Sequence, residues 1–198
     1  MSKLNPFSNK AKVITKNNIH NILKKYDIFQ NINNIDIYQE AFIHESYSIP
    51  YVQKIMDRDN IQLASRLDGV MPLQRKSYER LEYLGDAIIE GVFSKYLFER
   101  YPDENEDFLS RMRVCLVKGS MLAYLSKTIG LDKLLVVSRT MEEKENARFK
   151  ECILEDIFEA FIGALFEDFE NNMSCGHKIV TEFLINLIED ERTKINLV

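Results

Sequence analysis

The chain has 198 residues, of which 45% are hydrophobic, so it can bury the core of one domain or at most of two small ones. Its net charge of −5 at pH 7 disfavours a protein that coats nucleic acid through charge alone. The sequence has neither a membrane-spanning apolar run nor a secretory signal, so we expect an intracellular protein, whether cytoplasmic, organellar or encoded by a virus. In that setting, an odd number of scattered cysteines predicts reduced, buried thiols at Cys115, Cys152 and Cys175.

Apolar residues recur with helical spacing along most of the chain, which predicts an all-α domain over residues 17–192. Residues 1–16 are expected to form a flexible basic leader, and 193–198 a short tail. Ser77 is the expected N-cap of the first long helix, and Val136-Val137 is a strand-like fragment too short to build a sheet. The expected helices cover residues 17–26, 36–45, 78–100, 107–128, 147–169 and 176–192.

Residues 47–77 interrupt this pattern. Pro50, Gly69 and Pro72 give the stretch loop-like edges, with room for a helix between Val52 and Leu67.

Three carboxylates share one narrow stripe of the helix expected at 78–100. With about 100° per residue, Glu79, Glu82 and Asp86 fall within roughly 60° of one another. The opposite side of this helix is apolar and consists of Leu81, Leu84, Ile88 and Val92.

A second acidic pair, Asp156 and Glu159, lies on one face of the helix expected at 147–169. Small residues follow at Ala160, Gly163 and Ala164, and they would let another helix approach closely.

Two helices that each carry acids at this spacing can face each other across a bundle. The converging carboxylates would then repel one another unless a cation lay between them. Oxygen ligands suit Mg²⁺ or Mn²⁺ better than zinc, because these positions offer no His or Cys. The other interpretation is a solvated acidic stripe, and the spacing alone leaves both open.

Four segments, in order, resemble those of the ribonuclease III family. ERLEYLGDA (79–87) is similar to the family signature, in which the fifth position is more often Phe. FIHES (42–46) resembles an upstream L-T-H-x-S segment, from which Ile43 and Glu45 depart. LSRMRVCLV (109–117) and ILEDIFEAFIGALFED (153–168) resemble the family's S-x-x-R helix and its second acidic motif.

The resemblance implies an all-α, homodimeric helical bundle that cleaves double-stranded RNA with Mg²⁺, or with Mn²⁺ as a substitute. The products would carry 5′-phosphate and 3′-hydroxyl ends with short 3′ overhangs. The catalytic metal ligands would be Glu82, Asp86, Asp156 and Glu159. The resemblance adds Glu79 and Glu106 as auxiliary acids.

Other positions receive expected roles from the same resemblance. Tyr83 would pack into the partner subunit, with core filling as the alternative. His44 would donate a hydrogen bond to a backbone carbonyl, or steady the signature helix. Five basic residues would contact RNA phosphates: Arg75, Lys76, Arg111, Arg113 and Lys118. For Arg111, Arg113 and Lys118, the alternative is a solvated helix face or an ion pair. For Arg75 and Lys76, the alternative is a surface loop without a binding role.

Two features differ from compact bacterial members of that family. The segment 47–77 is expected to be an insertion, and the chain ends after its last expected helix, where a double-stranded RNA-binding domain would follow. We therefore expect either part of a longer protein or a nuclease that relies on a separate RNA-binding partner.

Two other functional classes compete with the nuclease. One is a ribonuclease III-like module that holds RNA or forms structure without cutting; the retained acids disfavour it. The other is a di-metal protein of the helical-bundle type, which would need Glu-x-x-His pairs. Residues 85 and 162 are Gly and Ile, so the sequence excludes this class.

Overall fold

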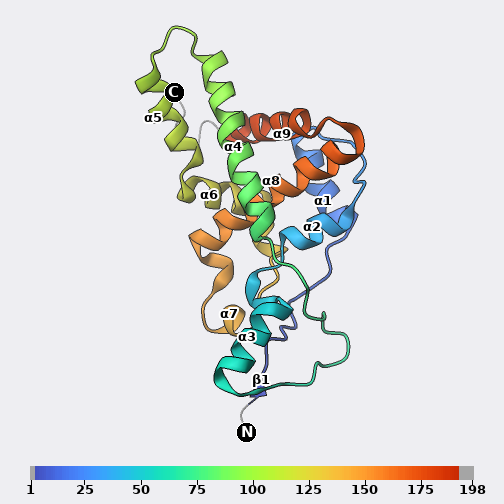
Figure 1. The fold of residues 1–198 in the computed structure, drawn as a ribbon. Coiled ribbons are helices and arrows are strands. Elements are labelled where there is room, and N and C mark those ends of the chain that lie inside the picture. Colours follow the sequence, from blue (N-terminus) through green and yellow to red (C-terminus); the bar gives the residue numbers. More distant parts are fainter. Residues whose placement is uncertain (1–2, 192–198) are drawn as a thin grey trace.

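The computed structural model describes residues 3–191, and over that range the fold is almost entirely helical (Figure 1). Short 3₁₀ turns connect several of the helices. The elements are β1 (Lys3–Leu4), α1 (Lys16–Leu23), α2 (Ile35–Ala41), α3 (Ile49–Asp59), β2 (Gln62–Leu63), α4 (Glu79–Arg100), α5 (Glu106–Val117), α6 (Gly119–Ile129), α7 (Arg139–Glu143), α8 (Glu151–Met173) and α9 (Gly176–Glu191). The expected tail at 193–198 lies outside the described residues.

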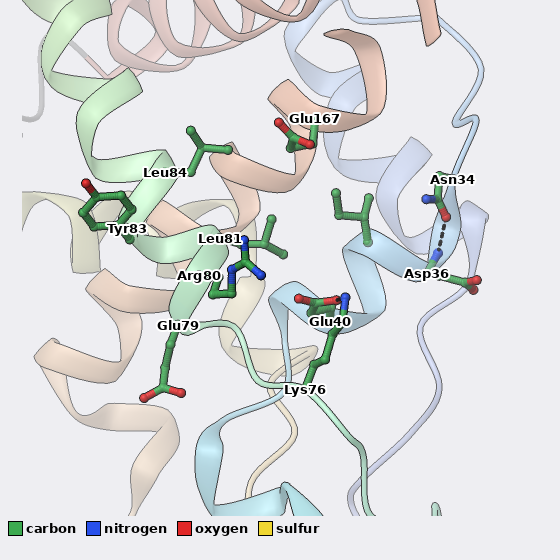
Figure 2. Close-up of a pocket in the computed structure, with 11 residues that line it drawn as sticks. Asn34, Asp36, Glu40, Lys76, Glu79, Arg80, Leu81, Tyr83, Leu84 and Glu167 are labelled. Carbon is green, nitrogen blue, oxygen red and sulfur yellow. Dashed lines mark hydrogen bonds and ion pairs between the residues drawn. The ribbon is translucent and has the colours of Figure 1, made fainter. Parts of the chain in front are cut away.

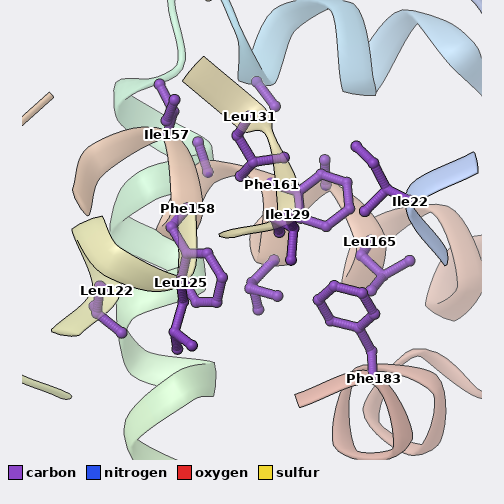
Figure 3. Packing of buried hydrophobic residues seen from close by; sticks show 14 of the residues in the cluster. Ile22, Leu122, Leu125, Ile129, Leu131, Ile157, Phe158, Phe161, Leu165 and Phe183 are labelled. Carbon is purple, nitrogen blue, oxygen red and sulfur yellow. The ribbon is translucent and has the colours of Figure 1, made fainter. Parts of the chain in front are cut away.

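Helix α8 is the centre of the fold, because α4, α6, α9 and α2 all pack against it. Apolar residues lie on almost every side of α8, the pattern of a helix buried on all sides. Phe158 and Phe161 of α8 lie in the middle of the main core (Figure 3). Phe161 meets Phe183 of α9 edge to face, with ring centroids 5.7 Å apart.

Helices α4 and α8 approach so closely that their backbones touch. A Cβ atom built on Gly85 would lie 1.8 Å from the carbonyl oxygen of Glu159. A Cβ on Gly163 would lie 2.2 Å from the carbonyl oxygen of Leu81. Both glycines are therefore required by lack of space, as the small residues of α8 had predicted.

The helix expected over 107–128 is two helices. Lys118 adopts an extended backbone (φ −63°, ψ 143°) that ends α5 and precedes α6. The bend lets Leu122, Leu125 and Ile129 of α6 enter the core (Figure 3). At the bend Gly119 is pressed against α8, since a Cβ there would lie 2.4 Å from a carboxylate oxygen of Glu155.

Two smaller expectations about helix ends also need correction. The N-cap of α4 is Tyr78 instead of Ser77, whose hydroxyl donates to Glu79 Oε2 at 2.7 Å. In the segment 47–77, a helix had been expected between Val52 and Leu67. The observed helix α3 begins earlier, at Ile49, because Ser48 caps it. It ends earlier, at Asp59, because Asn60 has a left-handed backbone (φ 48°).

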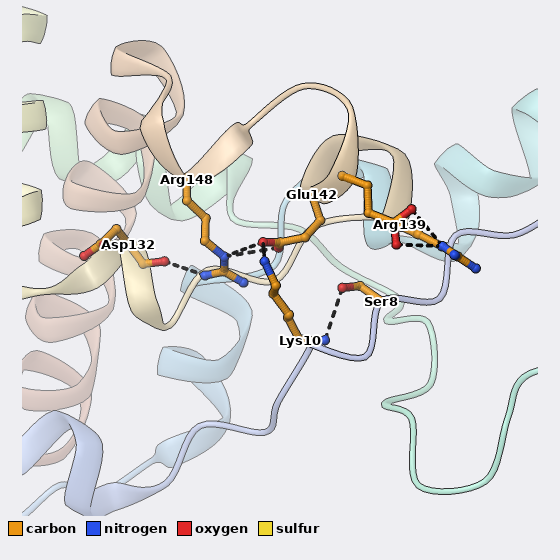
Figure 4. A network of polar contacts seen from close by, with 7 residues as sticks. Ser8, Lys10, Asp132, Arg139, Glu142 and Arg148 are labelled. Atoms are coloured by element: carbon orange, nitrogen blue, oxygen red, sulfur yellow. Dashed lines mark hydrogen bonds and ion pairs between the residues drawn. The ribbon is translucent and has the colours of Figure 1, made fainter.

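Within residues 3–16, the chain does not behave as the flexible leader that was expected. Residues Lys3–Leu4 pair in parallel with Gln62–Leu63 of the segment 47–77, a strand pairing that the sequence did not reveal. Ala11 and Ile14 are buried. Lys10 forms an ion pair of 3.0 Å with Glu142, which also accepts from Arg148 (Figure 4).

The segment 47–77 is closed at its base. Ile49 N donates to Gln74 O at 2.7 Å, and the buried Tyr47 hydroxyl donates to Met71 O at 2.6 Å. A small second core joins this segment to the N-terminal residues and to the strand-like fragment; its members are Ala11, Ile43, Tyr47, Met71 and Val136. Helices α3 and α7 and strand β1 thus form one end of the molecule, away from α5 (Figure 1).

The cysteines were expected to be buried, and this is wrong. Cys115 and Cys152 are exposed and Cys175 is half-buried; all three are free thiols. Both exposed cysteines lie on helices whose other faces supply the core.

The contact between α4 and α8 can be tested with two glycines of the same helix. We expect Gly85→Ala to lower the free energy of unfolding by more than about 2 kcal/mol, because backbone atoms of α8 occupy the space of the new methyl group. Urea denaturation followed by circular dichroism measures this change.

Gly91→Ala is the matched control. A Cβ at Gly91 meets nothing within 4 Å, so the alanine should stabilise α4 by roughly 0.5–1 kcal/mol. Equal effects of the two substitutions would contradict the close contact at Gly85.

Candidate active site

The candidate site lies where α4 crosses α8. The signature helix begins with the acids Glu79, Glu82 and Asp86, and α8 brings Asp156 and Glu159 against it. Gly85, whose missing side chain permits the crossing, lies directly before Asp86. The helix contact thus places acids from two distant parts of the chain in one region.

Glu159 is the most enclosed of these acids, with 8% of its surface exposed. Burial raises its pKa to about 8, and Asp86 is the nearby charge that adds most to this increase. Glu82 behaves similarly: burial and then Asp156 raise its pKa to about 7. The charged forms of Glu159 and Glu82 are thus each disfavoured by an acid on the other helix.

A sixth acid, Glu155, belongs to the group, and the sequence analysis missed it. The Glu155 carboxylate is half-buried, and burial together with Asp156 and Asp86 raises its pKa. It lies against Gly119 at the start of α6. The spacing of four residues from Glu155 to Glu159 was the available signal, because residues i and i+4 share a helix face.

The carboxylate of Asp156 is oriented by a tyrosine. Tyr78 Oη donates to Asp156 Oδ2 at 2.9 Å. Burial raises the pKa of Asp156, and this hydrogen bond opposes that effect. Sequence patterns do not predict this contact, because the two residues are 78 positions apart.

His44 lies on the other side of the Tyr78 ring, with ring centroids 5.7 Å apart. Its Nδ1 accepts from Ser46 N at 3.0 Å, and burial lowers the His44 pKa to about 4, so the ring is neutral at pH 7. The ring thus lies beside the residue that precedes the signature helix, and the partner of Nδ1 is a backbone N–H instead of the expected carbonyl.

The two auxiliary acids lie apart from each other. Glu79 is exposed, and its negative charge contributes to the raised pKa of Glu82. Glu106 begins α5, beyond the far end of α4, where it accepts from Ser110 at 2.7 Å. Within one chain the structure therefore places Glu79, but not Glu106, beside the acid group.

The expected RNA-binding residues differ in their exposure and in whether their side chains already have partners within the protein. Arg75, Arg111 and Lys118 are exposed. Arg113 is half-buried and donates to Ser94 at 3.3 Å, whereas Lys76 pairs with Glu40 at 3.0 Å. Lys118 follows the end of α5 and lies next to Gly119, which is in close contact with Glu155.

Tyr83 is 83% exposed, so core filling, the alternative for this residue, is wrong. It lies at the edge of a hollow of about 760 Å³ between α2, α4 and α8 (Figure 2). Asn34 and Glu40 line the α2 side, and Arg80 and Leu84 line the α4 side.

The acids offer only oxygen donors, which suit a hard divalent cation. Among residues 3–191, however, no three His, Cys, Asp or Glu side chains are already arranged to hold a metal ion. The chemical fit comes from the donors themselves and from their mutual repulsion, which a cation would relieve.

Solved structures share this architecture. The nuclease domain of ribonuclease III from Campylobacter jejuni is similar with a TM-score of 0.65 and 22% identity, over 88% of this chain and 94% of that one. Dicer from Pichia stipitis is similar with a TM-score of 0.51 and 23% identity, over 85% of this chain and 61% of the Dicer chain. The fold is thus that of ribonuclease III nuclease domains.

Sequence comparisons agree. Residues 79–170 match the family model of the ribonuclease III domain. A probable ribonuclease 3 of Acanthamoeba polyphaga mimivirus is 34% identical over 165 residues, and ribonuclease 3 of Staphylococcus aureus is 35% identical over 135 residues. The chain thus contains a ribonuclease III domain at residues 79–170.

The alignments cover 83% and 68% of this chain but only 28% and 47% of the viral and bacterial relatives. The chain therefore spans less than half of each. None of the helices within residues 3–191 is long and apolar enough to cross a membrane.

The raised acid pKa values predict how stability depends on pH. Because Glu159 keeps its proton up to about pH 8 when folded, the folded state binds more protons than the unfolded state between about pH 4.5 and 8. We expect the free energy of unfolding in EDTA to fall as pH rises through this interval. Glu159→Gln should flatten that slope and be more stable than wild type at pH 8 by on the order of 1 kcal/mol.

Urea denaturation at a series of pH values measures both effects. Glu90→Gln, which changes an exposed acid of α4, should keep the wild-type slope. A Glu159→Gln protein that follows the wild-type slope would contradict the repulsion described for this site.

Proposed function

We propose that this chain is an endoribonuclease that hydrolyses double-stranded RNA with the help of Mg²⁺. The supporting observation is that acids on α4 and α8 raise one another's pKa across a contact that only glycines permit. Partly buried like charges that raise one another's pKa are typical of functional sites.

Glu82, Asp86, Asp156 and Glu159 would hold the metal, with Mn²⁺ as a substitute for Mg²⁺. When bound, such an ion supplies Lewis-acid chemistry at a phosphate and activates water. The protein supplies the ligands and keeps them close. No side chain is assigned as a nucleophile. The products would carry 5′-phosphate and 3′-hydroxyl ends.

The RNA would lie over the exposed basic residues. Phosphates would be contacted by Arg111 in α5, by Lys118 at the end of α5 and by Arg75. Such contacts carry no sequence information, so this surface suits recognition of duplex shape. Arg113 and Lys76 would have to leave their present partners to join in.

A homodimer would provide two sites for the two strands and so leave short 3′ overhangs. The exposed Tyr83 beside the hollow supports this arrangement, because an isologous interface places the same patch on both subunits. A second Campylobacter jejuni nuclease-domain structure, 23% identical to this chain, is described as showing flexibility in a region involved in dimer formation.

Cleavage is the direct test. We expect the wild-type protein to cut end-labelled duplex RNA in Mg²⁺ and to leave it intact in Ca²⁺. Because the loss of a residue that merely supports a ligand typically costs about 10- to 100-fold, Glu159→Gln should cost more than about 100-fold. Gel sizing of the products shows whether the ends and overhangs are those proposed.

The competing function is a module that holds RNA without cutting it. RNA that is retained tightly, and remains uncut at every Mg²⁺ concentration, would favour that module over the enzyme. The Glu90→Gln protein, which keeps all proposed ligands, should cleave at the wild-type rate.

The dimer has its own test. Tyr83→Glu should shift the protein towards monomer, because it places a charge in the proposed interface. Sedimentation velocity measures the change. Phe98→Glu is the control: Phe98 is 69% exposed on the same helix but lies near its other end. Equal behaviour of the two variants would contradict an interface around Tyr83.

A further inference from the structure

Tyr78 joins the two halves of the acid group. Only 3% of its surface is exposed, and its hydroxyl donates to Asp156 Oδ2 on α8 at 2.9 Å. Its backbone oxygen accepts from Leu81 N at 2.8 Å and from Glu82 N at 2.9 Å, so the same residue starts α4. One side chain and its own peptide groups therefore contact both acid-bearing helices.

The Tyr78 ring is held in place from the other side. Tyr78 N donates to Ile43 O at 2.9 Å, which ties the residue to the segment before His44. The His44 ring meets the Tyr78 ring nearly edge-on, at an interplanar angle of 78°. His44 N in turn donates to Val136 O at 3.0 Å. With its backbone and ring both fixed, the hydroxyl points to one oxygen of Asp156.

We propose that Tyr78 is a positioning residue that orients Asp156 for metal binding. This inference rests on the proposed function, since it assigns a role at the same site. The hydroxyl engages Oδ2 and so leaves Oδ1 of Asp156 available to a cation. It also stabilises the ionised carboxylate in a buried setting. Residues that orient ligands in this way usually affect metal affinity strongly.

Tyr78→Phe removes the hydroxyl and keeps the ring. We expect the Mg²⁺ affinity to fall about 10-fold or more. Isothermal titration with Mg²⁺ alone, without RNA, measures the affinity. Cleavage of duplex RNA should require correspondingly more Mg²⁺ and should recover most of its rate at saturating Mg²⁺.

Tyr38→Phe is the matched control. The Tyr38 hydroxyl is also buried and also donates to a carboxylate, Asp168 Oδ2, at 3.2 Å. Asp168 instead accepts from Asn34 N at 2.7 Å and anchors the loop before α2. Tyr38→Phe should therefore lower stability and leave the Mg²⁺ affinity unchanged.

A double-mutant cycle separates positioning from general damage. If Tyr78 acts through Asp156, then Tyr78→Phe should cause no further loss of Mg²⁺ affinity once Asp156→Asn is present. Losses that simply multiply would overturn the inference. If Tyr78→Phe does not fold, His44→Gln can replace it, because it removes the ring that supports Tyr78 and keeps the Tyr78 hydroxyl. We expect His44→Gln to lower the Mg²⁺ affinity by less than Tyr78→Phe would. An unchanged Mg²⁺ affinity in His44→Gln would overturn the inference.

The outcomes distinguish this inference from the proposed function. If wild type binds Mg²⁺ and cleaves, and Tyr78→Phe matches Tyr38→Phe in affinity, only the role of Tyr78 is overturned. If wild type neither binds Mg²⁺ nor cleaves, the proposed function is overturned, and the role of Tyr78 with it.

Discussion

The backbone contact between α4 and α8 is the constraint on which the site depends. At Gly85 and Gly163 each helix lies against main-chain atoms of the other. Side chains at these positions would push the helices apart and carry the acids with them. Core packing and the electrostatics of the site are therefore set by the same two glycines.

This contact brings acidic side chains close together, which is electrostatically unfavourable, so packing elsewhere in the fold has to stabilise it. Glu159 is buried among other acids, and the helix that carries it is enclosed by core residues on most sides. Groups held at the expense of stability are typical of functional sites, because the surrounding structure must over-determine their positions. Here the surrounding structure is the aromatic core around Phe158 and Phe161.

Much of this was predictable because the signals are local. The helix expected at 78–100 is observed at Glu79–Arg100, since its apolar period is regular and Pro102 follows its end. The acid stripe followed from helical geometry alone. The break at Lys118 was missed, although the following Gly119 was a local signal, because apolar residues keep helical spacing on both sides of it; the close contact between Gly119 and Glu155, far along the chain, accompanies the break.

The candidate site shows the same division. Glu82, Asp86, Asp156 and Glu159 could be found from spacing and from family resemblance. Tyr78 could not, because its role depends on which oxygen its hydroxyl meets across the fold.

The ordered N-terminal residues have a consequence for how the protein is made. Lys10 and its partner Glu142 are 132 residues apart, so this ion pair can form only after the whole chain between them has been made. Strand β1 likewise can pair only after Gln62–Leu63 has been made. Such long-range closures form late, since the intervening chain must be ordered first. Residues 3–14 therefore gain the contacts that bury them only after Glu142 has been made, and until then their apolar side chains Ala11 and Ile14 lack their folded partners.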